Sequence, residues 1–234
     1  MEELGAAAGT ALRLIIGLDP ALVEIIGRSL RVNLTAVAIA SAIGFPTGAA
    51  VALFRFPGQR ATVILLNALM GLPPVVVGLI VLLLLSRSGP LGVLGLLFTP
   101  TAMIIAQTIL VTPIIAALTR QTVEDLWAEY RDQLRSLGAR PEQAMWTLLW
   151  DGRFSLFTAA LAGFGRASAE VGAVMIVGGN IDHVTRVMTT AIALESSKGN
   201  LSLALGLGIV LLLLTIAINA ALTLSREASR TAVA

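Results

Sequence analysis

Four long stretches of this chain contain no charged side chain, and each is long enough to cross a lipid bilayer. A helix needs about 20 apolar residues to span about 30 Å of hydrocarbon, because each residue rises only about 1.5 Å. The stretches are Val32 to Phe54, Ala61 to Ser86, Ser88 to Thr119 and Gly199 to Ser225. Only 13% of the residues are charged, against about 25% in a typical soluble domain. We therefore predict an all-α, polytopic integral membrane protein.

The stretch from Phe154 to Ile181 is also long and apolar, but it holds two charged side chains. Arg166 and Glu170 lie four residues apart on one face of a helix, so each can partly neutralise the other inside the membrane. We count this stretch as a span and predict five in all, at residues of about 32–54, 61–86, 100–119, 154–180 and 201–224. They form one membrane domain of residues 32–225, followed by a tail of residues 226–234.

The first 31 residues fit a span less well. Asp19-Pro20 divides them into two pieces that are each shorter than the membrane is wide, and charged residues are spaced among apolar ones, namely Arg13, Glu24, Arg28 and Arg31. This pattern is typical of an amphipathic helix that lies at the membrane surface. A sixth, tilted span over residues 4–30 is the alternative.

The distribution of positive charge predicts which side of the membrane each segment faces, because cytoplasmic loops carry an excess of lysine and arginine. With the carboxyl terminus inside, the outer segments hold six such residues, and half of these belong to the amino-terminal segment. The inner segments hold nine, which are Arg55, Arg60, Arg120, Arg131, Arg135, Arg140, Arg153, Arg226 and Arg230. The rule favours a cytoplasmic carboxyl terminus.

This orientation places the longest charged segment, Arg120 to Arg153, in the cytoplasm. Thr122 can cap a first helix, Gly138 can stop it in a left-handed conformation, and Pro141 suits the first turn of a second helix. The first helix has one apolar face, formed by Leu126, Tyr130, Leu134 and Leu137. A loop that only joined two spans would be shorter, so we predict a helical hairpin that presents a surface to a partner. An amphipathic cap resting on the membrane is the alternative.

Within this hairpin, the run from Asp132 to Gly138, followed by Leu148, resembles the loop of ABC-importer permeases that is written Glu-Ala-Ala, three residues, Gly, nine residues, Ile, any residue, Leu-Pro. The spacing fits, whereas Asp132 replaces the glutamate and Trp150-Asp151 stands where Leu-Pro is expected. In that family the loop docks in a groove of the cytoplasmic ATPase. The resemblance therefore implies docking by Asp132, Leu134, Gly138, Ala139, Arg140, Pro141 and Leu148.

Several further blocks, in the same order, are similar to the tungstate-transport permeases, which are close relatives of the molybdate permeases. These blocks are residues 71–78, 88–92, 98–102, 163–180 and 185–192. The resemblance implies a type I ABC-importer permease fold in the bacterial inner membrane. The implied partners are a second copy of the chain, cytoplasmic ABC ATPase subunits that bind ATP and Mg, and an external solute-binding protein. It implies no cofactor or metal in this chain.

Polar groups inside the spans are costly and usually face protein or water, so each is a candidate for the solute pathway. Arg166 and Glu170 lie about 18 to 24 Å into their span, at about 1.5 Å per residue. There they can line an outer gate, or they can lock the helix to a neighbour as an ion pair. A third option is that the arginine attracts the anion, although tight binding in a pore would slow release.

Three further features of the spans are pathway candidates. Pro73 and Pro74 together remove two backbone donors and should kink or unwind the second span, either to form a channel wall or for packing. Asn67 and Gln107 can contact solute, but hydrogen bonding between helices is the ordinary role of such amides.

Other function classes lack the residues that they need. The chain has no cysteine and a single histidine, His183 beside Asp182, which is a poor metal site. Its basic residues are scattered singly, unlike a nucleic-acid patch. No Gly-x-x-x-x-Gly-Lys-Ser/Thr phosphate loop occurs, so the chain is not itself an ATPase. Two alternatives remain: an ion-gradient-driven secondary transporter of small anions, which expects paired broken helices, and an intramembrane enzyme, which would need clustered His, Asp or Glu.

Overall fold

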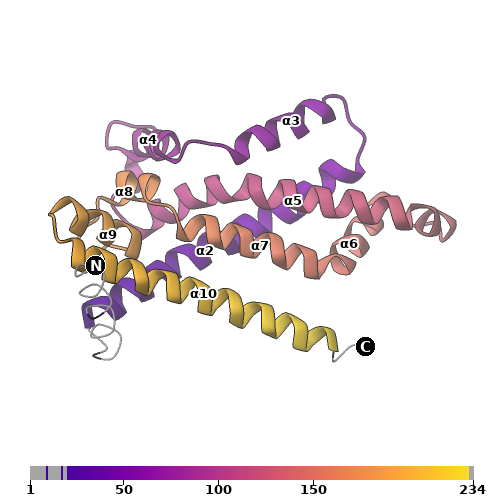
Figure 1. The fold of residues 1–234 in the computed structure, drawn as a ribbon. Helices are drawn as coiled ribbons and strands as arrows, with labels where there is room; N and C mark the ends of the chain where they lie inside the picture. The colour runs from indigo at the N-terminus through magenta and orange to yellow at the C-terminus, as the bar shows by residue number, and fades with distance from the viewer. Residues whose placement is uncertain (1–8, 10–16, 18–19, 232–234) are drawn as a thin grey trace.

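In the computed structural model of the chain, the described residues, which are 9, 17 and 20–231, form helices and loops and no strand. The elements are α2 (Pro20–Leu53), α3 (Gln59–Met70), α4 (Pro74–Leu85), the short 3-10 helix η1 (Gly92–Leu94), α5 (Pro100–Ser136), α6 (Pro141–Asp151), α7 (Arg153–Ser168), α8 (Gly172–Gly178), α9 (Met188–Ser197) and α10 (Leu201–Thr231). The prediction of an all-α protein is confirmed. In Figure 1, α6 lies at one end of the bundle, the hairpin end, and α4, α8 and α9 lie at the other, the distal end.

Three helices, α2, α5 and α10, are long and apolar enough to cross a membrane alone. Two bent pairs, α3 with α4 and α7 with α8, pass the same test, and counting each pair as one span gives the predicted five. Two boundaries differ from the prediction. Because α2 starts at Pro20, residues 20–31 continue the first span instead of forming a separate surface helix, and α10 extends through residues 226–231 of the predicted tail. Apart from residues 9 and 17, the earlier part of the amino-terminal segment lies outside the described residues.

Two of the charges that favoured a surface helix, Glu24 and Arg28, neutralise each other in the first turns of α2. Arg28 forms an ion pair with Glu24, and its guanidinium also donates hydrogen bonds to the carbonyl oxygens of Arg186 and His183 at 3.1 and 2.7 Å. The His183 side chain is 72% exposed, as expected of a loop residue, and its Nδ1 lies 2.8 Å from Glu24 Oε2. These contacts tie the start of α2 to the loop between α8 and α9.

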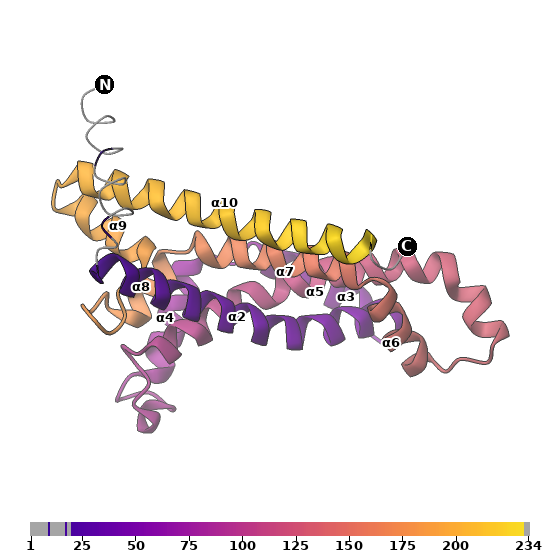
Figure 2. The same cartoon turned by 90° about the horizontal axis from the view of Figure 1, so that it is seen from below.

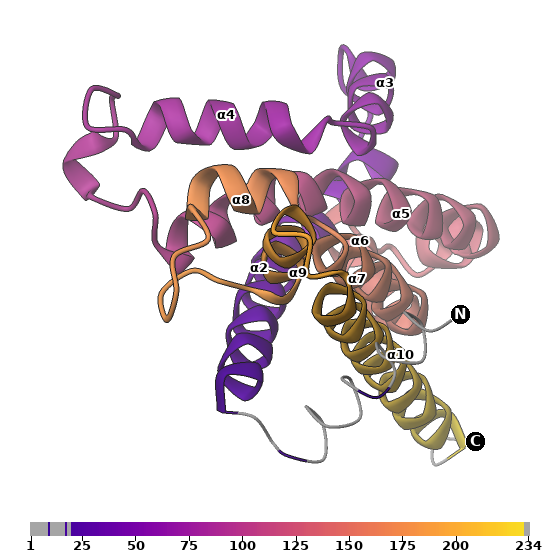
Figure 3. The same cartoon turned by 60° about the vertical axis from the view of Figure 1, so that its left-hand side comes forward.

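The second span bends by 99° between α3 and α4. Pro74 is the first residue of α4, and neither Pro73 nor Pro74 can donate a backbone hydrogen bond to the helix that precedes it. The predicted kink is therefore confirmed. As Figures 1 and 3 show, α4 turns across the distal end of the bundle and lies against α8.

The fourth span, predicted as one helix, bends by 62° between α7 and α8. No proline marks this break. Glu170 lies in it, and its Oε1 accepts the backbone N–H of Ala173 at 3.0 Å. That bond caps the first turn of α8, where no earlier carbonyl of the same helix is available. A carboxylate inside the span thus allows a break that we did not predict.

The hairpin has the predicted turn but not the predicted first helix. Thr122 lies inside α5, and its hydroxyl donates to the carbonyl of Leu118 at 3.0 Å. The prediction of a helix start at Thr122 is wrong, because a threonine can bond to the carbonyl four residues earlier as well as cap a helix. Gly138 has φ of 71°, as a left-handed helix stop requires, and α6 begins at Pro141.

Close contact between α2 and α5 forms the centre of the bundle, and glycines on α2 make it possible. A Cβ atom at Gly48 would lie 2.3 Å from the carbonyl oxygen of Ala116, and one at Gly44 would lie 2.9 Å from Cγ2 of Ile115. In lipid, where burying apolar surface between helices gains little, such close packing supplies much of the association energy.

The last helix packs on the outside of this centre. Figure 2 shows α10 running beside α7 along the bundle. At the distal end, Leu207 and Val210 of α10 form an apolar cluster with Met188 and Ala191 of α9 and with Leu22 of α2. Farther along, Ile218 packs against a cluster from α2, α5 and α7. The fifth span is thereby attached at two levels.

Replacing Gly48 with alanine should destabilise the protein by about 1–3 kcal/mol, because the added methyl collides with backbone that cannot move aside alone. Gly27 is the matched control, since it lies on the same helix and a Cβ there would meet nothing within 4 Å. The measurement is the monodisperse fraction that survives heating in detergent, determined by size-exclusion chromatography. Equal loss for G48A and G27A would contradict the packing argument.

Candidate translocation site and docking hairpin

The break between α7 and α8 holds the charged pair that the sequence singled out. Arg166, in the last turn of α7, donates from Nη1 to Oε2 of Glu170 at 3.0 Å. The Glu170 side chain is only 4% exposed, whereas 32% of the Arg166 side chain remains exposed. The pair therefore lies at the edge of the buried interior, with the carboxylate inside and the guanidinium reaching outward.

Glu170 also joins three helices through its other polar atoms. Its second carboxylate oxygen caps α8 at Ala173, and its backbone carbonyl accepts a hydrogen bond from Oγ1 of Thr189 on α9 at 2.9 Å. One residue thus neutralises Arg166, starts α8 and anchors α9. Such sharing means that a movement of α7 is transmitted to both distal helices.

Gln107 on α5 faces the same break from the opposite side. Its Nε2 donates to the carbonyl of Ala167 at 3.2 Å, and it is 2% exposed. Within the described part of the chain, its Oε1 has no hydrogen-bond partner. Gln107, Arg166 and Glu170 line a crevice too narrow to hold a water molecule. The three residues form a closed, mostly buried polar site across the bundle.

A further polar contact near this break was missed by the sequence analysis. Asn33 on α2 donates from Nδ2 to Oγ of Ser168 at 3.2 Å, and both residues are buried. The signal was present, because Asn33 is a polar residue inside the first charge-free stretch. It links α2 to the end of α7, two residues from Arg166.

Of the remaining pathway candidates, the structure brings the two prolines near the site and leaves Asn67 apart from it. Val75, which follows Pro74, packs on α8, since a Cβ at Gly172 would lie 2.9 Å from its Cγ2. The two broken spans therefore meet where each is interrupted. Asn67 is exposed on α3, a helix that buries none of its residues, and does not join the buried cluster.

The tip of the hairpin carries most of the docking candidates at its surface. Asp132, Gly138, Arg140 and Pro141 are exposed, and Leu137 beside them is 81% exposed. The backbone of the tip is well bonded, because the N–H of Ala139 donates to the carbonyl of Leu134 and the N–H of Arg140 to Oε1 of Gln143. The tip is a defined surface.

Two docking candidates support this surface from inside. Leu148 is 1% exposed and packs with Ala49, Val123, Leu149 and Leu156, so it holds α6 onto α2, α5 and α7 and does not reach the surface. Leu134 is partly buried against the same cluster. The hairpin is therefore attached to the spans by a core of its own.

Comparison with known proteins decides the family. The family described as "Binding-protein-dependent transport system inner membrane component" matches residues 42–231. The chain belongs to this family. Membership and the helical bundle confirm the predicted type I ABC-importer permease fold, and the chain is a multi-pass permease component of a transport system.

Three known proteins resemble the chain over most of its length. A "Probable anion ABC transporter permease protein" of Haloferax volcanii is 43% identical over 204 residues, which is 85% of this chain and 88% of that protein. A "Tungstate uptake system permease protein TupB" of Peptoclostridium acidaminophilum is 42% identical over 222 residues, covering 95% and 97% of the two chains. The protein of the same name from Campylobacter jejuni is 36% identical over 192 residues, covering 82% and 80%.

Replacing Glu170 with alanine should destabilise the protein by about 2 kcal/mol, because it leaves the Ala173 N–H and the Arg166 guanidinium without their shared acceptor. Glutamine keeps an acceptor for the cap and should cost less. Asp132→Ala is the control, since Asp132 is 85% exposed and pairs with Arg131 at the surface, where ion pairs contribute little. Thermal unfolding in detergent measures all three. Equal stability of E170A and wild type would contradict the role of Glu170 in the break.

Proposed function

We propose that this chain is the membrane-spanning subunit of an ATP-driven importer that carries an oxyanion, tungstate or its chemical relative molybdate, across the bacterial inner membrane. The names of its relatives support the substrate, since two are tungstate uptake permeases and one a probable anion permease. The folded hairpin between the third and fourth spans carries the mechanism. The hairpin has a core and an exposed tip of its own, which a loop that only connected two spans would not need.

The length of α5 supports docking to a cytoplasmic ATPase. This helix has 37 residues, or about 55 Å at about 1.5 Å per residue, so about 25 Å projects beyond a hydrocarbon core of about 30 Å. The docking surface is the exposed tip of the hairpin, formed by Asp132 near the end of α5 and by Gly138 and Arg140 in the turn that follows. The ATPase subunit binds ATP and Mg, because this chain has no phosphate loop.

The hairpin is connected to the break between α7 and α8 by a short rigid path. A single residue, Gly152, separates α6 from α7, and a Cβ there would lie 3.0 Å from Cδ1 of Leu126. Movement of α6 must therefore move α7. The far end of α7 carries Arg166, so closure of the ATPase sites acts on the ion pair with Glu170.

Within this mechanism, the polar cluster of Arg166, Glu170 and Gln107 acts as the distal gate. The crevice between these side chains is closed, and the adjacent break at Pro73-Pro74 lets α4 and α8 move together as one layer. Separation of α7 from α5 would open the crevice beside the partly exposed guanidinium of Arg166, whose positive charge favours an anion. Asn67 on α3 lies on the same predicted path farther toward the hairpin end.

A second copy of the chain completes the pathway. Asn67 lies inside an apolar span and is exposed, and a polar amide facing lipid is costly. α4 likewise exposes Val75, Val76, Leu79, Ile80 and Leu83. In a homodimer in which α3 and α4 face the partner, the Asn67 amide is removed from lipid and can form hydrogen bonds in the interface. The surface that then faces lipid is apolar.

In this assembly the hairpin end faces the cytoplasm and the distal end faces outward, where the loop region of residues 181–200 meets an external solute-binding protein. The carboxyl terminus of α10 is then cytoplasmic, as the count of nine inner against six outer basic residues favours.

A secondary transporter is the second candidate, and one observation favours it. Such transporters use pairs of broken helices that meet near the substrate. The structure shows two broken spans in contact, whereas the sequence indicated only one broken span. The docking hairpin and the family argue for the ATP-driven importer. The energy source distinguishes the two candidates.

Cells that depend on this chain for oxyanion uptake should import tungstate or molybdate while ATP is present, and should lose uptake when ATP is depleted even if the ion gradients are kept. The chain should also co-purify with an ATPase in mild detergent. In a Gly138→Val variant, both uptake and ATPase stimulation should fall at least about tenfold, because a β-branched residue is strained at positive φ and distorts the tip.

Gly58 gives the matched control for this variant. It also has positive φ, 90°, with nothing within 4 Å of an added Cβ, but it lies in the loop between α2 and α3. Gly58→Val should lower stability by a similar amount and leave coupling intact. Equal loss of coupling in both variants, or uptake that follows an ion gradient in ATP-depleted cells, would exclude the proposed mechanism.

The orientation can be tested by cysteine labelling, because the natural chain has no cysteine. Val93, 99% exposed near the distal end, and Leu137, 81% exposed at the hairpin tip, are suitable positions. A membrane-impermeant maleimide should label Val93→Cys in intact cells and Leu137→Cys only after permeabilisation. Labelling of Leu137→Cys in intact cells would reverse the topology and remove the docking role.

A further inference from the structure

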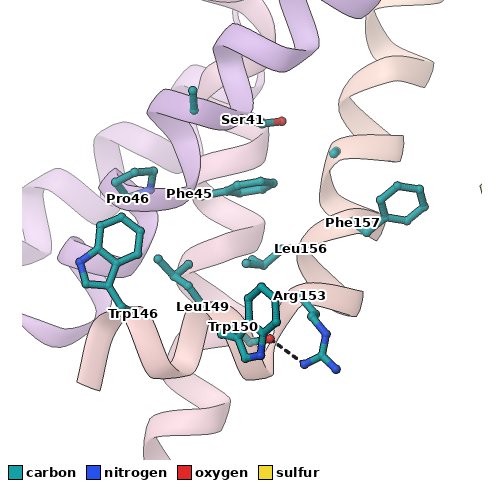
Figure 4. Close-up of a pocket in the computed structure, with 11 residues that line it drawn as sticks. Ser41, Phe45, Pro46, Trp146, Leu149, Trp150, Arg153, Leu156 and Phe157 are labelled. Carbon is teal, nitrogen blue, oxygen red and sulfur yellow. Dashed lines mark hydrogen bonds between the residues drawn. The ribbon is translucent and has the colours of Figure 1, made fainter. Parts of the chain in front are cut away.

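A pocket of about 530 Å³ lies at the hairpin end between α2, α6 and α7. Figure 4 shows the aromatic rings of Phe45, Trp146, Trp150 and Phe157 around it, with Leu149 and Leu156 at its floor. Its lining is almost wholly apolar. Neither the gate nor the docking surface uses this pocket, although it adjoins the joint between α6 and α7.

The α2 side of the pocket lies within the predicted first span, whereas its α6 side belongs to the hairpin. Ser41, which lines it, precedes the end of α2 at Leu53 by 12 residues, or about 18 Å along the helix. Ser41 and Phe45 both fall inside the predicted first span of residues 32–54. A soluble ATPase that docks on the hairpin tip does not reach this depth, whereas lipid chains surround it. Hydrocarbon is the natural content of such a pocket.

The mouth of the pocket has the composition of a membrane–water boundary. Trp146 and Trp150 are 61% and 72% exposed, and tryptophan rings concentrate at the level of the lipid headgroups. Beside them, Arg153 stacks its guanidinium over the Trp150 and Phe154 rings, with 5.2 and 4.7 Å from its Cζ to the ring centroids. A cation is thus held at the mouth of an apolar slot.

Within the described residues, the guanidinium of Arg153 donates one hydrogen bond and keeps further N–H groups for a ligand. Its Nη1 donates to the carbonyl of Trp150 at 3.0 Å, and an arginine has five N–H donors in a fork that fits a phosphate. Arg153 is the charged residue among those that line the pocket. Its charge is complementary to an anionic headgroup, while the slot below is complementary to an acyl chain.

We infer that this pocket binds an anionic phospholipid, with one acyl chain between α2 and α7 and the phosphate on Arg153. Its assignment to the cytoplasmic leaflet, which carries the anionic lipids, rests on the proposed function. The bound lipid packs against the root of α6, so it braces the joint through which the hairpin moves α7. A second copy of the chain is the competing occupant.

Tryptophan quenching by brominated lipids tests this inference in the full chain, which has three tryptophans. Trp127 lies in the hairpin core, so a Trp127→Phe background leaves Trp146 and Trp150 as reporters. In phosphatidylcholine vesicles, a small fraction of brominated phosphatidylglycerol should quench them with about fivefold higher apparent affinity than brominated phosphatidylcholine, as one well-placed basic residue supports. Arg153→Gln should abolish the preference. Arg55→Gln removes an exposed arginine just after α2, the helix that forms one wall of the pocket. This variant should retain the preference for phosphatidylglycerol.

Four results would overturn the inference. Equal quenching by the two brominated lipids, or a preference that survives Arg153→Gln, would exclude headgroup binding at this site. Loss of the preference in Arg55→Gln as well would mean general surface attraction. Quenching that appears only when the chain is dissociated into monomers would assign the pocket to a second copy. None of these measurements needs ATPase or solute, so failure here is distinct from failure of the importer assignment, which uptake and labelling test.

Discussion

Every backbone amide inside a bilayer must find its hydrogen-bond partner within the protein, because hydrocarbon offers none. This constraint makes a break in a span costly, and the described part of the chain contains two such breaks. At Pro73-Pro74 the problem is reduced by removing donors, since proline has no N–H. At the break between α7 and α8 an acceptor is added, because the Glu170 carboxylate caps Ala173. The two solutions are chemically opposite. The helices that follow the two breaks, α4 and α8, pack against each other at the distal end.

This arrangement explains why a charged pair lies inside an apolar span. A carboxylate that caps a helix in a dry site needs a neutralising cation, and Arg166 supplies it one turn earlier. The same carboxylate residue anchors α9 through Thr189. The Arg166–Glu170 pair can therefore be both a structural lock and a gate. A lock that sits at a break, with its cation one-third exposed, is also the part of the structure that a movement of α7 would strain first.

The features that sequence could predict are those in which one residue type has one physical consequence. Charge-free runs marked the spans, Pro73-Pro74 the first bend, and Gly138 the turn at positive φ. Errors arose where a residue has two uses. Thr122 bonds within α5 instead of capping a helix, Glu170 caps a helix as well as pairing with Arg166, and Glu24 and Arg28 neutralise each other within α2. Only the tertiary neighbours, such as His183 and Thr189, decide between such uses.

The hairpin and the broken spans are parts of one mechanical element, because α7 runs between them without interruption. At one end, Leu156 belongs to the core that holds α6, and at the other, Ser168 bonds to Asn33 and Arg166 to Glu170. A helix of 16 residues is about 24 Å long and transmits a displacement with little loss, since its own hydrogen bonds resist bending. The polar contacts at its distal end can exchange partners at much lower cost than the apolar core at its root can open. In the proposed mechanism, a movement that begins at the hairpin would therefore change the polar contacts at the break first.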